Sequence, residues 1–219
     1  FGALPSGHLL QSRREGERTI VVRGDQGIPA SRARDAIASA LAAELGLLTS
    51  GRTPIELYLN GAYWGAYDLR ERVDAGFLVD HLGEGSYDLL SHDSENRKIW
   101  LTPVAGDINA WDETMETLRD LDMSSDEGLA RAEAMFDLAN TIDYWAHNII
   151  VGNVDWPHNN ISVYRRTDGD DRRWRWISWD LDIAFADSDH NTLAWAARET
   201  LRHDLKWNYA KGSRDAEHL

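Results

Sequence analysis

Cysteine is missing from the 219 residues of this chain, and lysine nearly so, with three residues against twenty arginines. The lack of cysteine excludes disulfide bonds, thiolate metal sites and a cysteine nucleophile, and it leaves the redox compartment undetermined. Long apolar runs are missing too. None approaches the roughly 20 residues that a membrane-spanning helix needs, so we expect no membrane span.

Positive charge is scarce, because 23 Lys and Arg residues stand against 37 Asp and Glu residues, for a net charge of -14. Nucleic-acid binding needs clustered Lys and Arg against the phosphates, so this balance argues against nucleic acid as a partner and favours basic proteins. Hydrophobic residues make up 42% of the chain and include ten tryptophans. Such a chain can bury a core, as one large domain or as two tightly joined lobes.

Two β-hairpins are predicted. The first joins alternating segments within residues 55–69 through Asn60-Gly61, the favoured dipeptide for a tight turn. The second joins residues 161–166 and 173–179, which are rich in β-branched and aromatic residues and flank the turn signal Asp-Gly-Asp-Asp at 168–171. This second hairpin brings the polar loop before it next to the polar loop after it.

Helices are predicted from apolar residues at helical spacing. One begins after Ser31 as its N-cap residue, is rich in alanine and carries an apolar stripe of Ile37, Leu41 and Leu45. Four further helices are expected at residues 77–82, 111–121, 126–145 and 193–205. Together with the hairpins they predict an α+β protein.

The two polar loops around the second hairpin hold the candidate site. Asp155 and Asn160 lie in the first loop, and Asp180 and Asp182 in the second. Two carboxylates two positions apart on an extended segment point to the same side, and their repulsion favours a bound cation. Asp182 is the preferred metal ligand, whereas Asp180 is either a second ligand or a hydrogen-bond acceptor.

Each of these residues also has an ordinary structural explanation. Asp155 precedes Trp156-Pro157 in a turn, where Asp is common for its local hydrogen bonds. Taken together, however, Asp155, Asn160 and Asp182 follow the order and spacing of protein kinases, in which one Asp accepts the hydroxyl proton while an Asn and a later Asp hold magnesium. Five tryptophans near these loops are expected to pack around the site: Trp145, Trp156, Trp174, Trp176 and Trp179.

Three motifs occur in order along the chain, NGAYWGAYDLRERVD, DWPHNN and WRWISWDLDIAFA. Together they resemble the spore coat protein H (CotH) family of atypical kinases, roughly from Thr19 to Asp189. The resemblance implies a reduced, two-lobe kinase-like fold: an N-terminal antiparallel sheet with a helix, and a mostly helical C-terminal lobe with a β-hairpin at the active site. It also implies that the protein uses ATP and Mg²⁺ to phosphorylate Ser or Thr on protein acceptors. Mn²⁺ and Ca²⁺ are alternative metals.

The resemblance assigns roles to individual residues. Asp155 becomes the catalytic base, and Asn160, Asp182 and Asp180 become metal ligands. Three further residues are expected near the nucleotide: Arg23 on the first strand, and Glu71 and Asp74 at the connection between lobes that follows the first hairpin. Ion pairing with the neighbouring arginines explains Glu71 and Asp74 equally well.

Several kinase features are missing, namely the GxGxxG phosphate loop, the Val-Ala-Ile-Lys strand and any lysine before Lys98. A cation must still neutralise the nucleotide phosphates. Arg13, Arg14, Arg18 or Arg23 could do so, or a residue upstream of Phe1. The polar stretch at residues 91–98 is either an exposed lid or an acceptor contact.

We expect a single CotH kinase-like domain over residues 1–219, truncated at both ends. Residues up to about 72 are expected to resemble the N-terminal lobe of a kinase, and those from 73 on the C-terminal lobe. The protein acceptor is expected to be basic and Ser-rich. The protein is expected to be secreted or to lie at the cell surface or in the spore coat, and its oligomeric state is open. Two other functions fit the same residues. One is a non-catalytic surface or coat module that binds calcium or carbohydrate, and the other is a carboxylate-metal phosphohydrolase.

Overall fold

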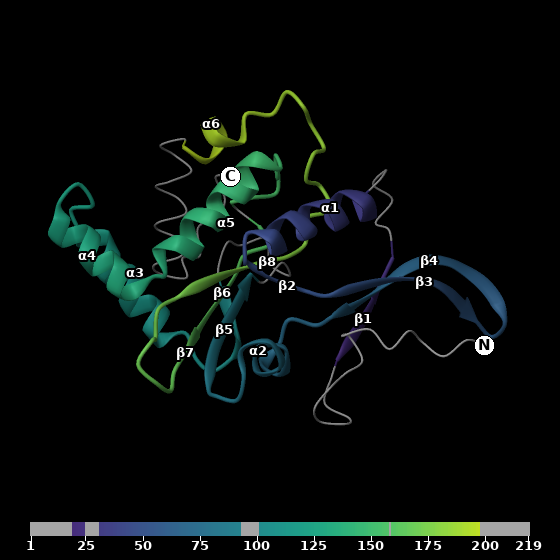
Figure 1. The fold of residues 1–219 in the computed structure, drawn as a ribbon, viewed down its shortest axis with the longest axis horizontal. Coiled ribbons are helices and arrows are strands. Elements are labelled where there is room, and N and C mark those ends of the chain that lie inside the picture. Colours follow the sequence, from purple (N-terminus) through teal and green to yellow (C-terminus); the bar gives the residue numbers. More distant parts are fainter. Residues whose placement is uncertain (1–18, 25–30, 93–100, 158, 198–219) are drawn as a thin grey trace.

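The structure is a computed structural model that describes residues 19–24, 31–92, 101–157 and 159–197. Within these ranges helices and strands alternate irregularly along the chain, and Figure 1 shows their arrangement. Their bounds, in chain order, are β1 (Ile20–Arg23), α1 (Ser31–Glu44), β2 (Leu48–Thr49), β3 (Arg52–Leu59), β4 (Ala62–Glu71), α2 (Ala75–Leu82), β5 (Tyr87–His92), β6 (Leu101–Ala105), α3 (Asn109–Asp120), α4 (Asp126–Met135), α5 (Leu138–Ile150), β7 (Ser162–Arg166), β8 (Arg175–Ser178) and α6 (Thr192–Ala196).

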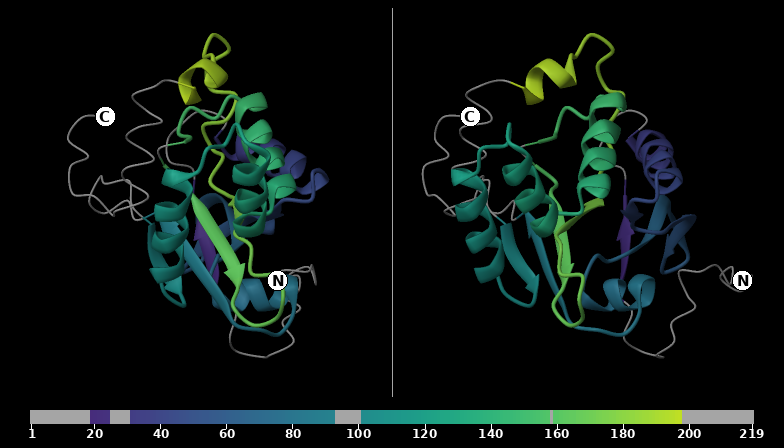
Figure 2. Two further views of the ribbon diagram at one scale, coloured as in Figure 1. Left: turned by 90° about the vertical axis from the view of Figure 1, so that its left-hand side faces the viewer. Right: turned by 60° about the vertical axis from the view of Figure 1, so that its left-hand side comes forward.

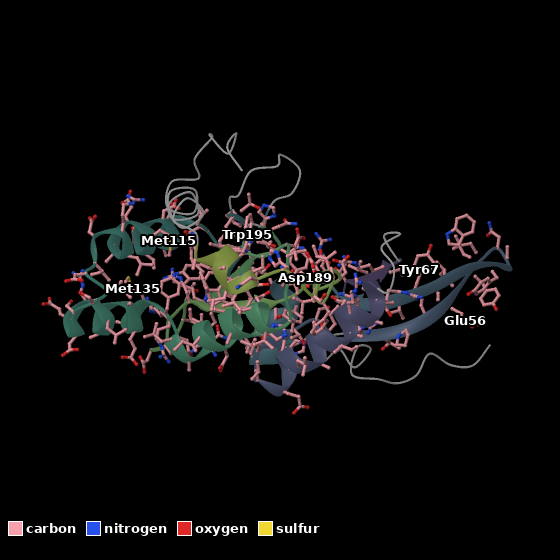
Figure 3. All side chains as sticks on the ribbon, turned by 90° about the horizontal axis from the view of Figure 1, so that it is seen from above. Glu56, Tyr67, Met115, Met135, Asp189 and Trp195 are labelled. Carbon is pink, nitrogen blue, oxygen red and sulfur yellow. The ribbon has the colours of Figure 1, made fainter. Side chains whose placement is uncertain are left out.

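A three-stranded antiparallel sheet has the order β1-β4-β3. It contains the first predicted hairpin, whose turn residues Asn60 and Gly61 both have positive φ, as a tight hairpin turn requires. Because β1 pairs only with the last four residues of β4, the hairpin continues beyond it as a two-stranded ribbon. Figures 1 and 3 show this ribbon, with Glu56 and Tyr67 on it, projecting at the end of the molecule opposite Met115 and Met135.

The second sheet has five strands in the order β2-β8-β7-β5-β6. Its β7–β8 pair is the second predicted hairpin, which the structure confirms, and β2 joins β8 in parallel. The mixed α and β content agrees with the predicted α+β class. The hairpin at the site is thus part of a five-stranded sheet, and the kinase-like two-lobe arrangement stays a prediction.

The five-stranded sheet has a core on each face, because successive residues of a strand point to opposite sides. On one face Val163, Leu90 and Trp174 pack with Trp111 of α3 and Phe136. On the other face residues of β5, β7 and β8 pack against α2, in a cluster of Phe77, Leu78, Tyr87, Leu89, Tyr164 and Ile177. The sheet therefore lies between α2 and the α3–α4 pair, as the views in Figure 2 also show.

The helix predicted at residues 126–145 is two helices, α4 and α5, with a break at Phe136 and Asp137. The Asp137 carboxylate accepts a hydrogen bond from the Asn140 backbone N–H at 3.2 Å and so caps α5. Phe136 forms a β-bridge with Trp174. Helical periodicity missed the break because the apolar spacing continues through it.

The apolar stripe predicted on α1 is at the surface. Ile37, Leu41 and Leu45 are 56%, 44% and 47% exposed, whereas Ala38 and Ala42 are fully buried. Small side chains on the buried face allow the α1 backbone to approach α5 closely, so the Ala38 carbonyl accepts a hydrogen bond from His147 at 2.8 Å. A close helix contact thus replaced the packing of large side chains that the stripe predicted.

Some expectations fall outside the described residues. The helix predicted at residues 193–205 is present as α6 in its first part, and residues from 198 on lie outside the described ranges. His158 and residues 93–98 of the polar stretch also lie outside them. In the described part of the chain, no helix is both long and apolar enough for a membrane span. The domain bounds at residues 72 and 73 stay a prediction.

The buried His147 predicts how stability depends on pH. Burial lowers its pKa from 6.5, although the hydrogen bond to the Ala38 carbonyl opposes the shift. The imidazole therefore stays neutral in the fold while the unfolded chain takes up a proton, so stability is lost as the pH falls below about 6.5, by at most about 1.4 kcal/mol per pH unit. Denaturant unfolding at pH 7 and pH 5 should show a smaller loss for His147→Gln than for the wild type. An equal loss in both proteins would contradict this.

Candidate active site

Buried carboxamides position the first polar loop. Asn148 of α5 and Asn153 are almost fully buried, and the Asn153 amide donates to the Asn148 side-chain oxygen at 2.9 Å. The Asn153 side-chain oxygen in turn accepts from the Asp155 backbone N–H at 3.2 Å. Because buried polar groups must be paired, this chain of hydrogen bonds fixes the Asp155 backbone relative to α5. Sequence patterns did not indicate Asn153.

The Asp155 carboxylate is held by two neighbouring amides. Asn159 and Asn160 each donate a side-chain hydrogen bond to the same Asp155 oxygen, Oδ2, at 2.8 Å. The Asn160 amide also reaches the Asp180 carbonyl oxygen, at 3.4 Å. The hairpin therefore brings the two polar loops together, as the sequence predicted.

Both loops contain a residue in the left-handed backbone region, since Asn160 and Asp180 have φ of 55°. Asn and Asp adopt this conformation more readily than other residues with a Cβ, yet it still costs energy in most contexts. Such conformations gather at functional sites, where the surrounding structure holds them in place. The two positive φ values mark the turns from which the Asn160 amide reaches Asp155 and the Asp180 carboxylate reaches Arg23.

Arg23 of β1 lies against the acidic pair. Its guanidinium forms an ion pair with Asp180 and a 3.1 Å hydrogen bond with Asp182 Oδ2. Burial raises the pKa of Asp182, and the charges of Asp180, Asp35 and Asp155 raise it further, against the opposing effect of Arg23. The Asp155 charge acts on Asp182 only because the two carboxylates are near each other. Burial likewise raises the pKa of Asp180.

Asp35 of α1 is 1% exposed and joins three parts of the fold. Its Oδ2 accepts from the guanidinium of Arg70 on β4, and its Oδ1 accepts from the Leu181 backbone N–H at 2.9 Å. Leu181 lies between the two acidic residues, so Asp35 also sets the position of their loop. From the sequence, Asp35 is one of four charges on a helix that the kinase resemblance places where a phosphate-positioning ion pair belongs. The sequence did not single out Asp35, because its partners lie 35 and 146 residues away.

A cleft of about 410 Å³ opens beside these residues, between the three-stranded sheet and strands β5 to β7. The charged residues Arg23, Arg70, Glu71 and Arg72 line one side. The opposite side has mostly small polar side chains and one indole, from Ser91, His92, Thr102, Ser162 and Trp179. Three arginines in the lining, Arg23, Arg70 and Arg72, favour a ligand with an anionic group.

The predicted nucleotide residues differ in their surroundings. Arg23 and Glu71 line the cleft. Glu71 also accepts a hydrogen bond from the Gly51 backbone N–H at 2.9 Å and pairs with His81 at 3.0 Å. Asp74 caps α2, because its carboxylate accepts from the Phe77 backbone N–H at 3.0 Å. A cap is a sufficient structural reason for Asp74, and its nucleotide contact stays a prediction.

The acidic pair offers part of a metal site. In the described ranges, no three His, Cys, Asp or Glu side chains form a ready cluster around one point. The donor chemistry nevertheless fits magnesium, which prefers oxygen ligands and often takes only one or two carboxylates from the protein. Asp180, Asp182 and the Asn160 amide oxygen are such donors, and the guanidinium of Arg23 shows that the space between the two carboxylates attracts a cation.

Comparison with known protein families assigns the chain. A family model described as CotH kinase protein matches residues 12–213. The chain belongs to the CotH kinase family. No curated protein matches the sequence significantly. Membership of the CotH family indicates a kinase-type function, and the family model covers all the site residues described above.

Removal of the Asp35 carboxylate should destabilise the protein. Asp35→Ala leaves the largely buried Arg70 guanidinium and the Leu181 N–H without their partner, which should lower the free energy of unfolding by about 3 kcal/mol. Asp35→Asn retains an acceptor and should lose less. Urea unfolding measures both, with Asp120→Ala at the exposed end of α3 as the control. A loss below about 1 kcal/mol for Asp35→Ala would contradict the structural role.

Asp74 should act through its cap. We expect Asp74→Ala to lower the free energy of unfolding by about 1 kcal/mol, and Asp74→Ser, which keeps a capping oxygen, to restore most of it. Nucleotide affinity, measured by calorimetry, should stay within about twofold of the wild type for both variants. Unchanged stability with a large loss of nucleotide affinity would favour a direct contact between Asp74 and the nucleotide instead.

Proposed function

We propose that this CotH-family protein is an ATP- and Mg²⁺-dependent kinase that phosphorylates Ser or Thr hydroxyls on protein acceptors. The observation that carries the proposal is the linkage of Asp155, Asn160 and Asp182: Asn160 binds Asp155, and the charge of Asp155 acts on Asp182. Asp182 in turn binds Arg23, which lines the cleft. The three side chains come from two loops on either side of a hairpin. Phosphoryl transfer needs this grouping of a base, hard oxygen ligands and cations.

Asp155 is the proposed base. The amides of Asn159 and Asn160 fix one of its carboxylate oxygens, so the carboxylate has a defined orientation before an acceptor arrives. Its task is to hold the acceptor hydroxyl in line with the phosphate and to take up the hydroxyl proton. Asn148 and Asn153 support this geometry from α5.

Asp182, with Asn160 and Asp180, is the proposed holder of magnesium, and the bound ion would neutralise charge on the nucleotide phosphates. The raised pKa values of both aspartates support this assignment, because they reflect burial and crowded negative charge that a cation relieves.

Arg70 is the proposed replacement for the missing phosphate-binding lysine. It lines the cleft and is held by Asp35 of α1. Protein kinases hold their phosphate-binding lysine in the same manner, through an acidic residue on a helix of the N-terminal lobe. A guanidinium keeps its charge at all relevant pH values and can bind two phosphate oxygens at once. Arg23 and Arg72 are the other two arginines that line the cleft.

The acceptor is proposed to be a basic, Ser-rich protein, because the net charge of -14 attracts basic partners and repels acidic ones. A cell-surface or spore-coat location is proposed from the CotH family, whose members are associated with the spore coat. The same charge disfavours nucleic acid as an acceptor.

The decisive test is Asp155→Ala. Phosphate transfer from Mg-ATP to a basic, Ser-containing peptide should fall by about 10²-fold to 10⁴-fold, because the general base is lost. Nucleotide affinity by calorimetry should stay within about threefold, since Asp155 is assigned to the acceptor hydroxyl. Asp170→Ala, in the exposed β7–β8 turn, is the matched control and should retain full activity.

Other outcomes would identify other functions. Phosphate release from ATP without any transfer would indicate a carboxylate-metal phosphohydrolase. If the wild-type protein binds no nucleotide but binds calcium or an oligosaccharide in calorimetry, it is a non-catalytic surface module. Equal activity of Asp155→Ala and wild type would exclude Asp155 as the base.

A further inference from the structure

The outward face of α1 is apolar and exposed. Ile37 and Leu41 lie one turn apart on it and are 56% and 44% exposed, and Leu45 follows just beyond the helix at 47%. Ala33 and Ala40 are exposed on the same side. A solvent-facing helix surface normally carries charged side chains, so this stripe is unusual on a chain of net charge -14.

No described element packs on this stripe. α1 contacts β2 and α5 through its opposite face, where Asp35, Ala38 and Ala42 are buried. Both panels of Figure 2 show α1 at the periphery of the molecule beside α5. Within the described residues, the stripe is therefore uncovered.

The charges at the two ends of the stripe indicate which molecule binds there. Arg34 lies near the beginning of α1 and Glu44 at its end, and neither forms an ion pair with another described residue. The sequence is symmetric about Ser39: Arg34 and Glu44 are each five positions from it, and Ile37 and Leu41 are each two positions from it. In an antiparallel pair of α1 helices, Arg34 of each copy faces Glu44 of the other, and Ile37 faces Leu41.

We propose that the outward face of α1 is an isologous interface with a second copy of this chain, formed by antiparallel packing of the two α1 helices about Ser39. Such twofold contacts are the commonest way in which identical chains associate. The small residues Ala33 and Ala40 let the two helices approach, and the apolar stripes bury each other. Opposite charges meet at both ends of the seam.

The interface is small. A helix of 14 residues is about 21 Å long, so one helix pair buries less than the roughly 1,600 Å² of a standard interface. The rest of the surface also opposes association, because two chains of net charge -14 repel each other. The dimer is therefore a reversible one with a dissociation constant in the micromolar range.

Sedimentation velocity of the full chain, from about 1 to about 200 µM at physiological salt, tests the proposal. The wild type should pass from monomer to dimer over this range. Leu41→Glu places one glutamate from each copy in the apolar interface, where the two negative charges repel each other. Association should weaken at least about tenfold. Leu129→Glu, at a residue of α4 that is 47% exposed, is the control and should associate like the wild type.

A charge exchange tests the antiparallel register. Arg34→Glu alone sets two glutamates against each other at each end of the seam, and Glu44→Arg alone sets two arginines together. Each single variant should therefore weaken association about threefold or more. The double variant restores opposite charges and should return association to within about twofold of the wild type.

Three results would overturn the proposal: a wild type that stays monomeric at about 200 µM, a dimer that Leu41→Glu leaves intact, or a double variant no better than its single variants. Circular dichroism of each variant shows that the fold is retained. Because sedimentation needs neither nucleotide nor catalysis, this result is independent of the proposed kinase activity.

Discussion

The buried carboxylate of Asp35 is the interaction on which the site depends. It binds Arg70 of the three-stranded sheet through one oxygen and the Leu181 backbone N–H of the acidic loop through the other. One side chain of α1 thus sets the distance between a cation of the cleft and the two aspartates. A charge buried to this degree is tolerated only when fully paired, so the three parts of the fold must keep their positions together.

Charges of both signs lie close together around the cleft. Burial and the charges of Asp180, Asp35 and Asp155 raise the pKa of Asp182, while Arg23 binds Asp182 and Arg70 lines the same cleft. In the proposed function, the metal ion matches the carboxylates and the nucleotide phosphates match the arginines. The amides that hold Asp155 add the orientation that electrostatics alone does not provide. α1 connects this site to the surface, because Asp35 and the exposed stripe lie on opposite faces of one short helix.

Local signals predicted the hairpins and most of the helices. Asn60-Gly61 and the Asp-rich turn at 168–171 dictate their turns through backbone preferences that need no distant partner, and both hairpins are present. The convergence of Asp155 and Asn160 with the acidic loop also followed from the second hairpin, since pairing two strands brings their outer ends together. The break before α5 did not follow, because capping by Asp137 competes with a periodicity that continues unbroken.

Sequence by itself thus determined the chemistry of the site: which carboxylates and amides flank the hairpin, and which charges the chain can offer a partner. Tertiary structure alone decided that Asp35 and Arg70 join the site, that Asp74 caps a helix, and that Ile37 and Leu41 face solvent. The physical reason is range. Turn and hairpin preferences act between near neighbours, whereas burial and ion pairing depend on which distant segments pack together, and here two alanines of α1 brought a helix backbone closer than a leucine stripe would have allowed.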